Sequence, residues 1–198
     1  DDRLAFISPS LEKMKPRKVI SWNINLDASL LLSGNVTWYP DLFESALIRK
    51  KLQNMTQEEL IKDMIEKDLP IDISDVKIDN LRNLNDNLKI EFKTNQKLNN
   101  AKFAIVHPFL KQKFYENPFL DSTRTWPVEF QYPYTETMQT TITFAEGLTP
   151  EALPASIVSE FADRSLIYQV NYQQSGNQIT ALSRYQLMNA KIASANYK

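Results

Sequence analysis

The side chains that could carry catalysis or hold a metal are few in this chain. Its 198 residues include no cysteine, one histidine (His107) and three glycines. A thiolate nucleophile, a cysteine-based zinc site and a disulfide are therefore excluded, and one imidazole supplies no second nitrogen ligand. Three scattered glycines cannot form a phosphate-binding loop or a dinucleotide fingerprint. We predict no catalytic residue, no cofactor and no metal site, and therefore no enzyme activity in this chain.

An acidic and amide-rich run is the nearest approach to a cation site. It comprises Asp72, Asp75, Asp79, Asn83, Asn85 and Asp86. A calcium loop usually turns around a glycine, and this run has none, so we interpret it as a solvated turn. His107 ends an apolar run before Pro108, and we interpret it as a strand-end histidine with one hydrogen bond.

Carboxylate pairs could in principle serve glycoside hydrolysis, for example Glu129 with Glu136 or with Glu146. Their spacing does not indicate which of them would converge. Charged residues on the outer face of a strand are the usual case. A self-contained hydrolase is therefore the weakest of the functional hypotheses.

Aromatic side chains offer a different kind of site. Trp22, Trp38 and Trp126 alternate with aliphatic residues, which is typical of core positions. A second set consists of tyrosines and forms our candidate binding face: Tyr132, Tyr134, Tyr168 and Tyr172, with Tyr185 as a further member. Such rings could stack on sugars or meet another protein domain. The alternative is packing with the hydroxyls at the rim of the core.

Composition limits the partners. Hydrophobic residues make up 42% and charged residues 24%, as in an ordinary globular protein. The net charge of −1 provides no field to recruit nucleic acid or anionic lipid. We expect no membrane span, because no apolar run approaches about 20 residues. The first residues lack the pattern of a secretory signal, and the opening on two aspartates leads us to expect a fragment or a processed product.

The elements that must position these residues are mostly strands. Two helices are predicted from Asp41 and Thr56, each followed by a capping glutamate three residues later. Strands are expected where apolar residues alternate, and a short hairpin is expected at 175–177. The predicted strands are 19–26, 30–39, 71–78, 88–94, 102–107, 126–132, 139–144, 157–161, 166–172 and 179–187, with a helix starting in 190–198.

This pattern predicts a mainly β (α+β) fold, an antiparallel β-sandwich with a two-helix insertion in the N-terminal half. We divide the chain into a lead-in segment (1–17), strands with the two-helix insertion (18–110) and a further sandwich part (111–198). A single continuous domain over 18–198 is the alternative.

One segment resembles a known family. Arg124, Pro127, Phe130 and Tyr132-Pro133, followed by Ile142, Gly147 and Leu153-Pro154, look like the C-terminal β-rich domain of bacterial transglutaminase-like multidomain proteins. In that family a proline precedes the x-Gly pair, whereas this chain has Ala145. The similarity extends over roughly residues 19–197.

The resemblance implies a role and a compartment. Such proteins carry an N-terminal β-domain, a papain-like core with a Cys-His-Asp triad, and a C-terminal domain without an assigned role. No catalytic residue transfers to this chain, because the triad belongs to the core. We therefore expect a noncatalytic accessory domain that packs on or positions upstream domains of the same polypeptide, in the periplasm or at the cell surface. A glycan- or peptide-binding module is the alternative.

Overall fold

The computed structural model describes residues 16–65, 71–98, 106–109, 125–161 and 163–194. Its N-terminal half contains β1 (Arg17–Leu26), β2 (Leu31–Tyr39), α2 (Leu42–Lys51), α3 (Gln57–Ile65), β3 (Asp72–Asp79) and β4 (Lys89–Lys97). Its C-terminal half contains β5 (Val128–Glu129), β6 (Tyr134–Phe144), β7 (Ile157–Glu160), β8 (Leu166–Ser175), β9 (Gln178–Leu187) and β10 (Lys191–Ile192).

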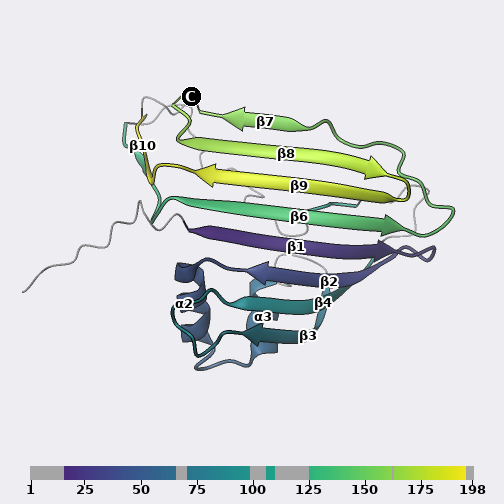
Figure 1. Cartoon of the computed structure of the whole chain (residues 1–198), viewed down its shortest axis with the longest axis horizontal. Helices are drawn as coiled ribbons and strands as arrows, with labels where there is room; N and C mark the ends of the chain where they lie inside the picture. Colours follow the sequence, from purple (N-terminus) through teal and green to yellow (C-terminus); the bar gives the residue numbers. More distant parts are fainter. Residues whose placement is uncertain (1–15, 66–70, 99–105, 110–124, 162, 195–198) are drawn as a thin grey trace, which may run out of the picture.

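Eight of these strands form one sheet in the order β3-β4-β2-β1-β6-β9-β8-β7 (Figure 1). All neighbours are antiparallel except β1 and β6, which run parallel at the centre. β5 and β10 form a separate two-stranded ribbon. The predicted class, mainly β with two helices, is confirmed. The predicted stacking into a sandwich is corrected, because the β1–β6 pairing joins the two sets of strands edge to edge within one sheet.

β1 lies at the centre of the sheet, and one of its faces is apolar. Ile20, Trp22 and Ile24 alternate with polar residues and are each less than a tenth exposed. β1 turns into β2 through Asp27, whose Oδ1 accepts hydrogen bonds from the backbone N–H groups of Ser29 (2.8 Å) and Leu31 (3.0 Å). These bonds hold the tight turn that sets the register of the hairpin.

Gly34 allows β1 and β2 to approach closely. It lies opposite Ile24, and a Cβ added to it would lie 2.1 Å from the carbonyl oxygen of Asn23. The register of β2 continues through Gly34 against both neighbouring strands, so the strand has no bulge there. The residue is needed for space between the strands.

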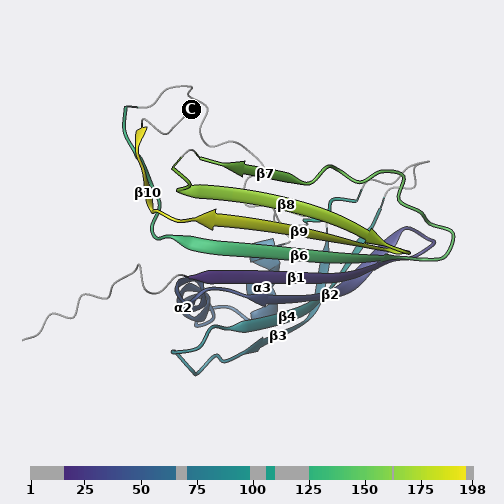
Figure 2. The same ribbon diagram turned by 45° about the horizontal axis from the view of Figure 1, so that its top comes forward.

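Both helices begin at the predicted caps. Asp41 accepts a hydrogen bond from the N–H of Glu44 at 2.8 Å, and Thr56 and Glu59 form a reciprocal capping box. The helices lie beside the β1–β4 half of the sheet (Figure 1 and Figure 2). They bury Ile48 of α2 and three residues of α3 (Leu60, Ile61 and Ile65) in the same core as the strands. Neither helix in the described ranges is long and apolar enough to cross a membrane.

The C-terminal half departs from the sequence prediction at its ends. The strand predicted at 126–132 is reduced to β5, since Pro127 and Pro133 cannot donate ladder hydrogen bonds, and Trp126 is 78% exposed instead of buried. β6 starts at Tyr134, well before the predicted residue 139. Of the helix expected in 190–198, residues 191–192 instead form β10, which pairs with β5, and residues 195–198 lie outside the described ranges. Most of the strand predicted at 102–107 lies outside the described residues.

The other predicted strands are confirmed. β8 and β9 form the predicted hairpin, in which Ser175 pairs with Gln178 around a two-residue turn. Gly176 in that turn has a φ of +57°, a backbone conformation that glycine adopts without steric cost. The predicted strands 71–78, 88–94 and 157–161 correspond to β3, β4 and β7.

Candidate functional site

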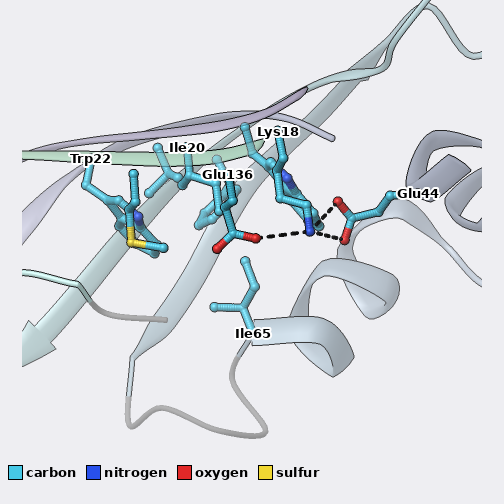
Figure 3. Close-up of a pocket in the computed structure, with 10 residues that line it drawn as sticks. Lys18, Ile20, Trp22, Glu44, Ile65 and Glu136 are labelled. Carbon is cyan, nitrogen blue, oxygen red and sulfur yellow. Dashed lines mark hydrogen bonds and ion pairs between the residues drawn. The ribbon is translucent and has the colours of Figure 1, made fainter. Parts of the chain in front are cut away.

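A cavity of about 220 Å³ lies between the sheet and the two helices (Figure 3). Its wall is formed by β1, β2, β4 and β6, with one side chain each from α2 and α3. Most of the lining is apolar: Ile20, Trp22, Val36, Trp38, Ile65, Phe92 and Met138. The remaining lining residues are charged: Lys18, Glu44 and Glu136. The cavity therefore combines an apolar wall with a small ionic cluster.

Strand register explains why charges meet an apolar wall. Lys18 on β1 lies directly opposite Glu136 on β6, and two residues further along Ile20 lies opposite Met138. Residues two apart on a strand share a face, so the charged pair continues the apolar rows toward the start of both strands. Trp22 then packs edge-on against Phe92, with ring centroids 5.9 Å apart.

The ionic cluster is largely buried. Lys18 Nζ lies 2.8 Å from Glu44 Oε2 and 3.5 Å from Glu136 Oε2. The three side chains are only 13%, 21% and 16% exposed for Lys18, Glu44 and Glu136 respectively. Burial by itself would lower the pKa of the Lys18 ammonium, but the attraction of both carboxylates outweighs it and raises that pKa. Burial raises the pKa of Glu44, and Lys18 offsets this only in part.

The charge of Asp41 lies close to this cluster. Asp41 is 2% exposed, caps α2 and accepts a hydrogen bond from the hydroxyl of Tyr132 at 3.2 Å. Tyr132 in turn stacks on Phe43 with ring centroids 4.4 Å apart. Burial and the neighbouring Asp41 carboxylate raise the pKa of Tyr132, so its hydroxyl remains a donor at neutral pH.

The predicted tyrosine set is only partly brought together. Tyr132 contacts Tyr134 at 6.1 Å between ring centroids, and Tyr134 contacts Tyr185 at 5.5 Å. Tyr185 lies opposite Tyr168 in the β8–β9 ladder, so these four residues follow one another from the segment before β6 across β6, β9 and β8. We call this set the tyrosine row. Burial raises the pKa of Tyr134 to about 12.

Tyr172, the remaining predicted member, packs elsewhere. Its ring centroid lies 6.3 Å from that of Phe109, and it borders the core. All four predicted tyrosines are partly buried. Their proposed role in binding remains a prediction.

The other candidate groups are engaged separately. His107 Nδ1 lies 3.1 Å from the carbonyl oxygen of Phe109, in agreement with the predicted single hydrogen bond. Glu129 pairs with Lys191 at 2.9 Å, whereas Glu136 belongs to the cavity. Within the described ranges, no three histidine, cysteine, aspartate or glutamate side chains gather as a metal site.

The sequence prediction missed the ionic cluster of Lys18, Glu44 and Glu136. The sequence did contain a pattern that indicated two of these residues, Lys18 and Glu136. Lys18 precedes Ile20 by two residues and Glu136 precedes Met138 by two, so each continues an apolar strand face. Strands predicted to start at 19 and 139 excluded both residues.

These features define a mainly β domain with an apolar cavity that is lined at one end by charged side chains. Residues 101–198 match the family described as a domain of unknown function with solved structure, DUF3858. This match covers β5 to β10, while β1 to β4 and both helices precede it. No curated protein and no solved structure matches the chain.

Proposed function

We propose that this chain is a noncatalytic accessory domain of an exported, transglutaminase-like polypeptide, and that it docks against a neighbouring domain of that polypeptide through the β7 edge of its sheet. The resemblance of the segment from Arg124 to Pro154, which lies within the DUF3858 match, supports this assignment. The periplasm or the cell surface is the corresponding compartment.

The single observation that carries the docking role is the exposed apolar pair on β7, the strand at this edge of the described sheet. Among the described residues, β7 pairs only with β8 and ends the sheet (Figure 1). Ile157 and Val158, on opposite faces of this strand, are 50% and 62% exposed. An edge strand has a row of unpaired N–H and C=O groups, which can accept a strand from another domain.

The opposite edge of the sheet is protected in the usual ways. β3 has a register shift between Ser74 and Lys77, and Asp75 in that interval has a φ of +54°. Asp75 also pairs with Lys93 at 2.8 Å. A bulge and charged side chains prevent strand addition. The contrast between the edges favours β7 as the docking side.

Hydrogen exchange can test this role. In the full-length polypeptide, the backbone amides of residues 157–160 should exchange at least about tenfold more slowly than in this chain alone, because docking protects an open edge. Val158→Lys should abolish that added protection, since it places a charge in the interface.

Leu84→Lys provides the matched control, because Leu84 is 74% exposed in the loop before β4. This variant should retain the added protection of β7. Equal exchange of β7 in the full-length polypeptide and in the isolated chain would remove the basis for docking at this edge.

The tyrosine row favours a glycan- or peptide-binding module as the second candidate. Partly exposed rings can stack on sugar or peptide groups. Binding to glycan and peptide arrays should be compared between the unaltered chain and Tyr168→Ala. Equal binding by both proteins would reject the tyrosine row as a binding face.

A further inference from the structure

The cavity has the size of one aromatic ring with a short tail. Its volume is about 220 Å³, and its apolar residues come from four strands and α3. A cavity of about 150 Å³ lined by aliphatic and aromatic residues is large enough to bind benzene. A ring with two or three further carbon atoms therefore fits the space beside Trp22, Trp38 and Phe92.

The charged end of the cavity selects the sign of the ligand. One ammonium group, Lys18, faces two carboxylates, Glu44 and Glu136, so the cluster has a net charge of −1 when all three are ionised. Asp41 adds a further negative charge close to Lys18. In a largely buried site this excess attracts a cation and repels an anion. A carboxylate ligand would meet a lysine that is already neutralised.

Glu136 can still accept a hydrogen bond from a ligand. Its Oε2 lies 3.5 Å from Lys18 Nζ, whereas charge-assisted N–H···O bonds are usually about 2.7–2.9 Å long. Glu44 holds the same ammonium group at 2.8 Å. A second ammonium group could therefore bind Glu136 without displacing Lys18 from Glu44 (Figure 3).

Trp22 leaves one polar group of the cavity wall without a partner, and an ammonium group, which is a donor only, cannot satisfy it. The Trp22 side chain lines the cavity, the residue is 1% exposed, and its indole N–H has no hydrogen-bond partner among the described residues. Buried donors without a partner are uncommon in folded proteins. The aromatic walls would also stabilise a cation near their faces.

We propose that this cavity is a binding site for a small protonated amine that carries one ring or a short apolar chain. The apolar part lies against the aromatic wall, and the ammonium group binds Glu136. The site is separate from the β7 edge, so it does not depend on the docking role.

Three probes of similar shape and different charge test the site. They are 2-phenylethylamine, 2-phenylethanol and 3-phenylpropanoate. Binding is measured by fluorescence in a Trp126→Phe background, where the two remaining tryptophans, Trp22 and Trp38, both line the cavity. The amine should bind about tenfold more tightly than the alcohol, and the carboxylate more weakly than either, because only the amine adds the attraction of opposite charges to its hydrogen bond with Glu136.

Glu136→Gln should remove most of the tenfold preference for the amine over the alcohol. Glu129→Gln, which makes the same charge change at an exposed pair with Lys191, should retain it. Circular dichroism and melting temperature establish that both variants are folded. If Glu136→Gln does not fold, the order of affinity of the three probes for the unaltered protein still tests the proposal.

Equal binding of the amine and the alcohol would overturn the proposal. Tighter binding of the carboxylate, or no response to any probe, would do the same. A folded Glu136→Gln variant that retains the full preference for the amine would also overturn it.

Discussion

Lys18 is the residue on which the charged end of the cavity depends. It is the only cation of the ionic cluster, and it is shared by Glu44 and Glu136, which come from a helix and from a different strand. Without it, two largely buried carboxylates would face each other close to Asp41. Lys18 therefore both holds the two carboxylates in place and sets the net charge at this end of the cavity.

We predict that Lys18→Met lowers the free energy of unfolding by about 3 kcal/mol at pH 7, the typical cost of removing one partner of a buried pair. Loss of the cation raises the folded-state pKa of Glu44 further above its ordinary value of about 4.5. The folded state then binds more protons than the unfolded state, so stability falls as pH rises. The deficit should therefore be smaller at pH 5 than at pH 7 in urea unfolding.

The control for this prediction is Lys191→Met. Lys191 also pairs with a glutamate, but its side chain is 67% exposed, so the free energy of unfolding should be nearly unchanged at both pH values. A deficit for Lys18→Met that is the same at pH 5 and pH 7 would contradict the assigned electrostatic role.

Residues whose roles are local could be predicted from the sequence, and those with distant partners could not. Asp41 and Thr56 cap helices through groups three residues away, so spacing alone indicated both caps. Glu44 was predicted to complete a capping box, but its carboxylate binds Lys18, 26 residues away. A tertiary ion pair replaced the local interaction, and no spacing rule reports such a pair.

At the scale of elements, alternation predicted the strands wherever one face is continuously apolar. β1, β4 and β9 are of this kind. The start of β6, Tyr134–Thr137, has no such alternation and is a strand because β1 and β9 pair with it on either side. β10 exists through its pairing with β5, about 60 residues earlier in the chain. Both the start of β6 and β10 are strands because they pair with strands that are distant in the sequence.

Gly34 tests how closely β1 and β2 must approach. We predict that Gly34→Ala lowers the free energy of unfolding by about 3 kcal/mol, because the new Cβ would lie 2.1 Å from the backbone oxygen of Asn23. Relief would require the two strands to separate. Urea unfolding of the variant measures the loss.

Gly176→Ala is the matched substitution in an open turn. Its added Cβ would meet no described atom within 4 Å, and only its positive φ is unfavourable, so we expect a cost of about 1 kcal/mol. If Gly34→Ala were no more harmful than Gly176→Ala, the close approach of the strands would not be a constraint on stability.

At the scale of the whole molecule, the parallel β1–β6 pair joins the segment that matches DUF3858 to the residues before it. β6 lies inside the match and β1 lies outside it. Ten residue pairs align along this junction, from Arg17 with Thr135 to Leu26 with Phe144. The sequence could not indicate this pairing, because parallel partners so far apart in the chain leave no local pattern.

This junction bears on whether the chain has one domain or two. We predict that residues 101–198 produced alone do not unfold cooperatively in urea, because β6 would become an eleven-residue edge strand with Met138, Ile142 and Phe144 no longer covered by β1. The fragment should also bind a hydrophobic dye and self-associate. Adding a separately produced fragment of residues 1–100 should reduce dye binding and restore a cooperative transition. A fragment that alone unfolds in one transition at the urea midpoint of the whole chain would instead establish an independent domain, and residues 1–100 and 101–198 would then belong to two folding units.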